Sequence, residues 1–175
     1  YILSGGAIVG KKEGEGPLKN TFDEIEKDAT FGGKNWEEGE SILQTRTAKL
    51  AIGKACMKES DIRYIFAGDL LGQLIATTYG VKDLNIPLFG LFGACSTMVE
   101  TLATGSMLID GGFANNILCC TSSHFCSAEK QFRYPYNQEL IEIPAGKVDP
   151  NEDLEKACIR ELEEETGYLA RKLIC

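Results

Sequence analysis

The chain alternates between two kinds of apolar pattern over residues 43–121. Apolar residues at helical spacing predict three helices. They cover Leu43–Met57, Leu71–Tyr79 and Ser96–Ile109. Compact apolar runs rich in β-branched and aromatic residues predict three strands between and after these helices. They cover Ile62–Ala67, Ile86–Phe92 and Ile117–Thr121. Because strands alternate with helices, the pattern predicts a layered α/β fold.

Two regions outside this pattern differ from it in composition. Residues Gly10–Gly39 are rich in glycine and charge, which predicts a long excursion over the surface. Further along, Ile141–Ile143 alternates like a strand, and Pro144–Gly146 predicts a turn. Helix-forming residues then occupy Asp153–Thr166, with carboxylates near the start of the helix. This region is therefore predicted to form a strand, a loop and a helix.

Three carboxylates share one face of that last helix. Glu161, Glu164 and Glu165 follow one another at i, i+3 and i+4. Like charges at this spacing repel by a few tenths of a kcal/mol per pair, about the size of a helix ion pair. A hard divalent cation with oxygen ligands would compensate for the repulsion. On composition alone, a solvated acidic face is the favoured interpretation, and the residues that surround the carboxylates reverse that preference.

The glycine, arginine and tyrosine residues around these carboxylates form a longer motif. It reads Gly146-x5-Glu152-x7-Arg160-Glu161-Leu162-x-Glu164-Glu165-x-Gly167-Tyr168. This motif resembles the signature of the Nudix hydrolases, which cleave nucleoside diphosphates linked to another group. The flanking residues 131–135 and 139–147 are similar to the ADP-ribose pyrophosphatase branch of that family.

The Nudix resemblance implies roles for individual residues. Glu161, Glu164, Glu165 and the Ala145 carbonyl would bind Mg²⁺ or Mn²⁺. Glu164, Glu165 and Arg160 would be the catalytic residues, while Gly146 and a Glu152–Arg160 ion pair would support the loop. The metal ions would polarise the diphosphate of a nucleoside diphosphate derivative and activate water.

Cys95 is the candidate for chemistry in the longer part of the chain. It follows Gly93-Ala94 at a predicted strand-to-helix turn. The dipole of the helix that starts there favours the thiolate form of a cysteine. A free cysteine is more often a small buried residue, so a packing role in a tight turn is the alternative.

Residues 1–135 resemble the stage V sporulation protein AD family, whose members have a thiolase-like fold. The likeness is carried by four segments, residues 9–18, 67–71, 89–97 and 121–135. It implies the N-terminal half of a thiolase-like layered fold that binds dipicolinic acid and works with other spore-transport proteins. Cys95, Ser96 and His124 would line the binding cleft, although a structural role in its loop is the favoured alternative for His124. Neither thiolase turnover nor a cofactor is expected for residues 1–135.

Composition and charge narrow the choice of partners. The chain has 175 residues, is 43% hydrophobic and has a net charge of −8. It can bury one core, and its acidity argues against binding nucleic acid or an anionic membrane surface. Seven cysteines without a CxxC pair, and no signal peptide, predict reduced thiols in a cytoplasm. No run is long enough for a membrane span, so any place at the spore inner membrane would be peripheral, through partner proteins.

The two resemblances divide the chain into segments 1–135 and 131–175. They overlap at Gln131-Phe132-Arg133-Tyr134-Pro135, which suits both families. We therefore hypothesise a chimeric reading frame that joins parts of two genes at this pentapeptide. Each part would be truncated, leaving sheet edges and helix faces bare, so marginal stability or a homo-oligomer is expected. The open functions are dipicolinate binding, Nudix hydrolysis and a non-functional fragment, so whether the chain is an enzyme stays undecided.

Overall fold

The computed structural model describes residues 1–70, 73–124, 153, 156–157, 159–160 and 163. The chain divides into two compact units, Tyr1–Pro135 and Tyr136–Cys175. Most of the described residues belong to the first unit.

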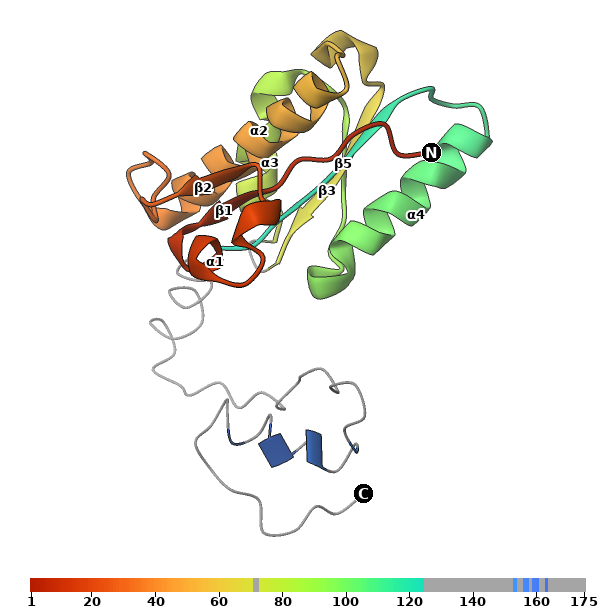
Figure 1. Cartoon of the computed structure of the whole chain (residues 1–175). Coiled ribbons are helices and arrows are strands. Elements are labelled where there is room, and N and C mark those ends of the chain that lie inside the picture. Colours follow the sequence, from red (N-terminus) through yellow and green to blue (C-terminus); the bar gives the residue numbers. More distant parts are fainter. Residues whose placement is uncertain (71–72, 125–152, 154–155, 158, 161–162, 164–175) are drawn as a thin grey trace. The chain divides into compact units, whose positions relative to one another are not determined.

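A parallel three-stranded sheet forms the centre of the first unit (Figure 1). Its order is β4 (Leu88–Gly90), β3 (Tyr64–Asp69) and β5 (Ile117–Ser122). Ala67 of β3 pairs with Gly90, and Asp69 pairs with Ser122. Because all three strands run in the same direction, their carboxyl ends meet at one edge of the sheet. We call this the carboxyl edge.

Helices cover both faces of the sheet, which gives three layers (Figure 1). The helices α2 (Trp36–Lys54) and α3 (Ile75–Val81) lie on one face, and α4 (Thr97–Asp110) lies on the other. The α/β fold expected from the sequence is thus confirmed. Four short 3₁₀ helices complete the connections. They are η1 (Lys19–Thr21), η2 (Glu59–Asp61), η3 (Lys82–Leu84) and η4 (Ala94–Ser96).

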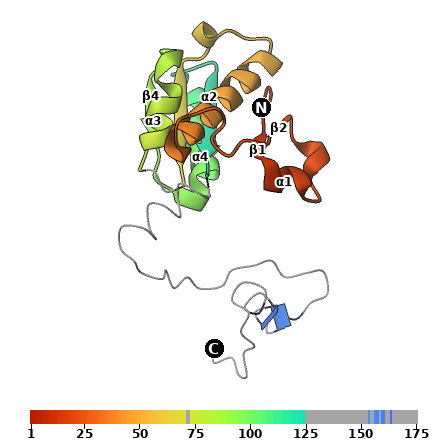
Figure 2. The same ribbon diagram turned by 90° about the vertical axis from the view of Figure 1, so that its left-hand side faces the viewer.

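A smaller parallel pair of strands lies beside α2 (Figure 2). It consists of β1 (Ile8–Gly10) and β2 (Glu24–Glu26), with α1 (Lys11–Glu15) between them in sequence. Arg46 of α2 bridges to Glu24 at 2.7 Å and to Glu26 at 3.1 Å. These ion pairs are partly exposed, so each contributes about 0–1 kcal/mol and mainly fixes where β2 lies.

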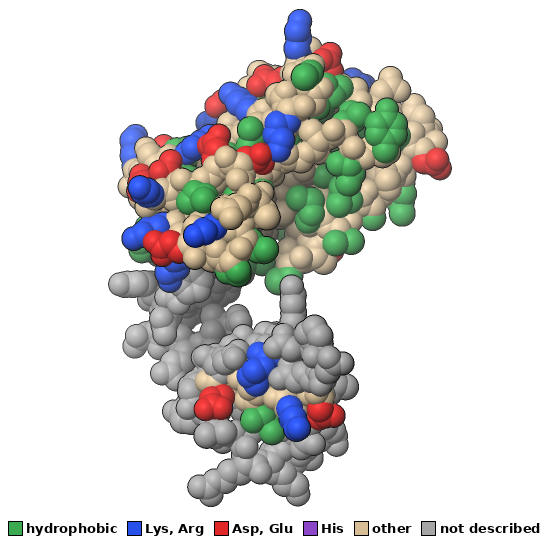
Figure 3. All heavy atoms as spheres, viewed as in Figure 1, with side chains coloured by type: hydrophobic (Ala, Val, Ile, Leu, Met, Phe, Trp, Pro, Cys, Tyr) green, Lys and Arg blue, Asp and Glu red, His purple; other side chains and the backbone are tan. Residues whose placement is uncertain are grey.

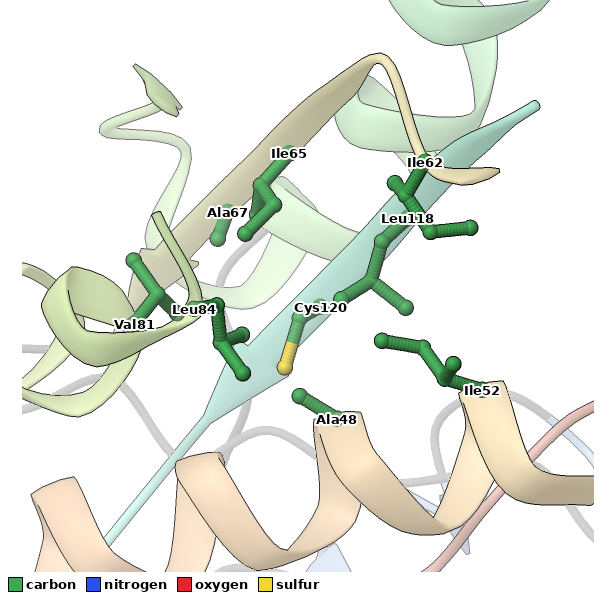
Figure 4. Close-up of a cluster of buried hydrophobic side chains, with 9 residues drawn as sticks. All are labelled: Ala48, Ile52, Ile62, Ile65, Ala67, Val81, Leu84, Leu118 and Cys120. Atoms are coloured by element: carbon green, nitrogen blue, oxygen red, sulfur yellow. The ribbon is translucent and has the colours of Figure 1, made fainter. Parts of the chain in front are cut away.

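The main hydrophobic core lies between the sheet and the α2–α3 layer (Figure 4). Its buried members are Ala48, Ile52, Ile62, Ile65, Ala67, Val81, Leu84, Leu118 and Cys120. The Cys120 thiol points toward Ala48 (Figure 4), and burial raises its pKa to about 12. Cys119 points the other way and lies 3.3 Å from the Thr101 carbonyl of α4. The side chains of adjacent strand residues alternate between faces, so both cysteines are packing residues.

The helix predicted from Leu43 begins seven residues earlier, at Trp36. Asn35 caps it, since its side chain accepts a 2.8 Å hydrogen bond from the Glu38 N–H. The buried side of its first turns carries polar residues, so the spacing of apolar residues does not indicate a helix there. The helix predicted from Leu71 begins later, at Ile75, because Gln73 and Leu74 have positive φ angles of 48° and 69°. Left-handed backbone cannot continue a helix.

The stretch Gly10–Gly39 is largely exposed, as expected for an excursion over the surface, but it also contains regular elements. It contains α1, β2 and the first turn of α2. Its Phe31 is buried against Ile8 and Leu43 in a second, smaller hydrophobic cluster. The apolar contacts of Phe31 thus hold this stretch against the rest of the fold, although its composition is rich in glycine and charge.

The second unit is described at a few residues only. Lys156, Ala157, Ile159, Arg160 and Glu163 are helical. The Ala157 N–H donates to the Asp153 carbonyl at 2.9 Å, which is the spacing of an α-helix. The predicted helix is confirmed at these positions, while the predicted strand 141–143 and turn 144–146 lie outside the described residues.

Candidate functional site

The loop that carries Cys95 crosses the carboxyl edge of the sheet. After β4, the Leu91 N–H donates to the Ala67 carbonyl at 2.9 Å, so the loop stays close to β3. A Cβ on Gly68 would lie 2.3 Å from the Leu91 carbonyl oxygen and 2.7 Å from Thr97 Cγ2. Only glycine allows the loop to approach β3 this closely. Gly68 therefore sets where the loop, and the start of α4 behind it, can lie.

Cys95 lies in η4, directly before α4, as the sequence predicted. Its side chain is exposed, so the alternative of a buried packing residue is wrong for Cys95. The preceding Ala94 has a φ of 48°, a left-handed conformation that costs a non-glycine residue about 1–3 kcal/mol. Such strain presents the next side chain at a fixed angle to the helix start.

Ser96 is also exposed, and its hydroxyl is held by two acceptors. Ser96 Oγ lies 2.8 Å from the Gly93 carbonyl and 2.5 Å from Glu100 Oε1. The Glu100 carboxylate itself packs against Gly93, where an added Cβ would lie 2.2 Å from Glu100 Oε1. These contacts fix the first turn of α4 against the loop that precedes it.

His124 follows β5 and ties the end of that strand to the loop before α2. Its Nε2 donates to the Ala29 carbonyl at 2.6 Å, since a carbonyl oxygen can only accept. The ring also packs edge-on against Phe31, with 6.2 Å between ring centroids. All three predicted cleft residues thus lie in segments that follow the strands at the carboxyl edge: Cys95 and Ser96 come after β4, and His124 comes after β5. Their role in binding stays a prediction.

A buried polar cluster at the same edge was not anticipated from the sequence. Its members are Glu40 and Gln44 of α2, Asp69 at the end of β3, Thr77 of α3 and Ser122 at the end of β5. Thr77 donates to Asp69 Oδ2 through its hydroxyl at 2.7 Å and through its N–H at 3.1 Å. Ser122 Oγ donates to Glu40 Oε1 at 2.9 Å. The cluster therefore links both helices to the ends of two strands.

Gln44 lies at the centre of this buried polar cluster. Its Nε2 is 3.3 Å from the Gly68 carbonyl, 3.3 Å from Thr77 Oγ1 and 3.4 Å from Ser122 Oγ. Burial raises the pKa of Glu40 to about 7; the Ser122 hydrogen bond lowers it, and the negative charges of Asp69 and Glu37 add to the rise. A protonated Glu40 at neutral pH is compatible with a second carboxyl group in the same cluster.

The signal for this cluster was present in the sequence. Glu40 and Gln44 are spaced by four residues, which places them on one helix face. The prediction missed Glu40 because it started the helix at Leu43, while Gln44 lies inside the predicted helix but was not singled out. Asp69 lies two residues after the end of a predicted strand, at the edge of the sheet where ligands bind in α/β proteins.

A pocket of about 690 Å³ opens at the opposite edge of the sheet, before the strands begin. It is lined by residues 59–63, 84–87 and 112–116, which precede β3, β4 and β5 respectively. Arg63 is the cation in this lining, and its guanidinium lies 5.2 Å from the ring centre of Tyr64. The predicted cleft residues are absent from the lining of this pocket.

Most of the predicted metal site lies outside the described residues. Arg160 is helical and half-buried. Ala145, Gly146, Glu152, Glu161, Glu164 and Glu165 have no described side chains. Among the side chains that the structure describes, three or more His, Cys, Asp or Glu residues nowhere gather as a metal site would require. The described helices likewise include none with the length and hydropathy needed to cross a membrane.

In comparison with known proteins, the two segments of the chain match different families. A segment of 44 residues is 57% identical to the ADP-ribose pyrophosphatase of Bacillus subtilis, covering 25% of this chain and 24% of that protein. Half of the chain superimposes on 3-oxoacyl-[acyl-carrier-protein] synthase III from Aquifex aeolicus with a TM-score of 0.43 and 22% identity, covering 30% of that structure.

The longer segment matches one family almost throughout. The family profile of stage V sporulation protein AD (SpoVAD) matches residues 1–145. The stage V sporulation protein AD of Bacillus subtilis is 42% identical over 135 residues, which cover 77% of this chain. The chain spans about 40% of the length of that relative. The chain belongs to the stage V sporulation protein AD family.

Proposed function

We propose that residues 1–135 bind dipicolinate at the carboxyl edge of the sheet, in the loop that leads into α4. The observation that carries the proposal is family membership, with 42% identity to a stage V sporulation protein AD. The chain spans only part of that relative, so the proposal concerns binding by this segment. In this proposal, transport into the spore depends on other spore-transport proteins, in the cytoplasm or peripherally at the spore inner membrane.

The chemistry of this loop suits a flat aromatic dianion. Dipicolinate carries two carboxylates on a pyridine ring, and the positive end of the dipole of α4, a helix of 14 residues, favours such a charge. Cys95 and Ser96 are exposed at this end, where a ligand carboxylate would take the place of Glu100 Oε1 as an acceptor of the Ser96 hydroxyl. Phe92, also exposed, offers an aromatic face in the same loop.

The same region supports binding better than thiolase-type turnover. His124 is the single histidine of the chain, and its Nε2 is engaged by the Ala29 carbonyl. A thiolase-type cysteine nucleophile is paired with a histidine base, whereas His124 is turned to the Ala29 carbonyl. We therefore assign Cys95 to ligand contact rather than to covalent catalysis.

Isothermal titration calorimetry of dipicolinate with the full chain tests this assignment. Cys95→Ala combined with Ser96→Ala should weaken binding roughly tenfold, because one charge-assisted hydrogen bond contributes about 1.5–3 kcal/mol. Cys56→Ala is the matched control, since Cys56 is equally an exposed cysteine but follows α2. Equal affinities in all three proteins, or no binding by the unsubstituted chain, would contradict the proposal.

A second candidate function concerns the Nudix segment. The 57% identity to an ADP-ribose pyrophosphatase supports it, as do the helical residues between Lys156 and Glu163. In this proposal Glu161, Glu164, Glu165 and the Ala145 carbonyl hold Mg²⁺ or Mn²⁺, whose chemistry is to polarise a diphosphate. Hard oxygen donors are the ligands that these cations prefer. Arg160 and Glu152 would hold the loop against the helix.

The joining of two families in one chain supports the hypothesis of a chimeric reading frame. One match covers residues 1–145, and the Nudix match covers a quarter of the chain. We place the join at Gln131–Pro135, where both resemblances overlap. Amplification of the locus from source DNA as one continuous product, with a matching transcript, would contradict this hypothesis.

A further inference from the structure

Glu100 is one of two charged residues in a long uncharged part of the chain. From Leu84 to Ala128, the only Asp, Glu, Lys or Arg residues are Glu100 and Asp110. On the face drawn in Figure 3, charged side chains gather over α1, β2 and α2, and few lie over α4. Glu100 is half-buried in the first turn of α4, and Asp110 is exposed at the last residue of that helix. A carboxylate at the start of α4 therefore stands out from its surroundings in the sequence.

The Glu100 side chain is turned back over the loop that precedes α4. Ser96 Oγ donates to Glu100 Oε1 at 2.5 Å, which is a charge-assisted hydrogen bond. A Cβ on Gly93 would lie 2.2 Å from Glu100 Oε1 and 2.3 Å from Oε2, so the carboxylate lies directly against the Gly93 backbone. The positive end of the helix dipole favours an anion at this place. Glu100 thus supplies the start of α4 with a carboxylate from the chain itself.

We propose that Glu100 is a built-in competitor of anionic ligands, whose carboxylate must leave Ser96 before a ligand carboxylate can bind at the start of α4. For dipicolinate, this inference rests on the proposed function, which brings a ligand carboxylate to the Ser96 hydroxyl. That hydroxyl has a single hydrogen to donate, and two carboxylates in contact with it would repel each other. The affinity for the ligand is therefore lowered by the cost of displacing Glu100.

Asp110 provides a matched control on the same helix. At about 1.5 Å per residue, Glu100 and Asp110 lie on the order of 15 Å apart along α4. This exceeds the distance of about 8 Å over which charges in water act on each other in about 0.15 M salt. Asp110→Asn therefore changes the net charge of the chain as much as Glu100→Gln does, while the start of α4 stays as it is.

Calorimetric titration of the full chain with dipicolinate, in about 0.15 M salt, tests the competition. Glu100→Gln should tighten binding about tenfold, because a neutral amide gives up the Ser96 hydroxyl more readily than a carboxylate and does not repel the ligand. Glu100→Ala removes the acceptor and repeats the test, and circular dichroism shows that each variant is folded. Asp110→Asn should leave the affinity unchanged. An unsubstituted chain that binds as tightly as both Glu100 variants would overturn the proposal, and so would equal tightening by Asp110→Asn.

Alkylation of Cys95 tests the same competition without dipicolinate. Iodoacetate is an anion and iodoacetamide is neutral, so the ratio of their rates at Cys95 measures how readily an anion reaches the start of α4. Peptide mass spectrometry gives this ratio for Cys95 and for Cys56, an exposed cysteine that follows α2. Glu100→Gln should raise the ratio about threefold at Cys95, as expected when one like charge within several ångströms is removed in water, and should not change it at Cys56.

The two measurements separate this proposal from the proposed function. A ratio at Cys95 that Glu100→Gln leaves unchanged would overturn the competition, whatever the calorimetry gives. A raised ratio, with no dipicolinate binding by any variant, would support the competition and contradict dipicolinate as the ligand.

Discussion

Glu40 shows how a single buried carboxyl group makes the stability of this fold depend on pH. It is 5% exposed and hydrogen-bonded to Ser122, while Asp69 lies in the same cluster. Burial raises its pKa from 4.5 to about 7. The folded state therefore prefers the protonated form, and the unfolded state ionises more readily.

Unfolding should become easier as pH rises between 4.5 and 7. The stabilisation linked to Glu40 is fully present below pH 4.5 and is lost once pH exceeds the folded pKa of about 7. The expected loss is about 3 kcal/mol at 1.36 kcal/mol per pKa unit. Urea unfolding at pH 4 and pH 8 measures it. Glu40→Gln should remove most of the difference; an unchanged difference in that variant would show that other groups cause it.

At the scale of elements, two glycines with opposite surroundings provide a matched test. Gly68 of β3 lies under the loop between β4 and α4, where an added Cβ would meet the Leu91 carbonyl oxygen at 2.3 Å. Gly53, near the end of α2, has nothing within 4 Å of an added Cβ. Replacing glycine by alanine should therefore strain β3 at residue 68 and be accommodated without a clash in α2 at residue 53.

Gly68→Ala should lower the unfolding free energy by about 1–3 kcal/mol, because the loop must move away from β3. Gly53→Ala should raise it by about 0.5–1 kcal/mol, the usual gain in a helix interior. Chemical unfolding of both variants gives the two values. Equal effects would mean that the close approach of the loop to β3 does not occur.

The sequence predicted those elements best whose apolar pattern matches their packing. β3 and β5 alternate between two buried faces, and the strands found lie within two residues of those predicted. The start of α2 was missed because its buried side carries Glu40 and Gln44, which conceal the apolar period. Cys95 was placed correctly, since a glycine turn before a helix is a local signal. The buried polar cluster is assembled from four elements and has no such local signal.

At the scale of the whole molecule, the two segments resemble different families, so we expect metal binding by the Nudix segment to be independent of ligand binding by residues 1–135. The metal ligands proposed for the Nudix segment lie in one short stretch, Ala145–Glu165. Metal binding needs only this stretch, whereas hydrolysis also needs a diphosphate held in line with activated water. We therefore expect weak metal binding without turnover.

Electron paramagnetic resonance of Mn²⁺ with the full chain measures this binding. The double substitution Glu161→Gln and Glu165→Gln should abolish it, because it removes two of three carboxylate ligands. Glu163→Gln on the same helix is exposed, lies outside the ligand set and should leave binding intact. ADP-ribose cleavage should equal that of buffer alone. Metal-dependent cleavage that the double substitution abolishes would contradict the expectation.

We propose that the chain binds dipicolinate at the carboxyl edge of the sheet, beside the start of α4. Amide chemical shifts of the full chain during a dipicolinate titration test it most directly. We expect shifts that gather at residues 93–100, with the amides of the opposite pocket, residues 59–63 and 112–116, unchanged. Shifts confined to that opposite pocket, or none up to about 10 mM ligand, would contradict it.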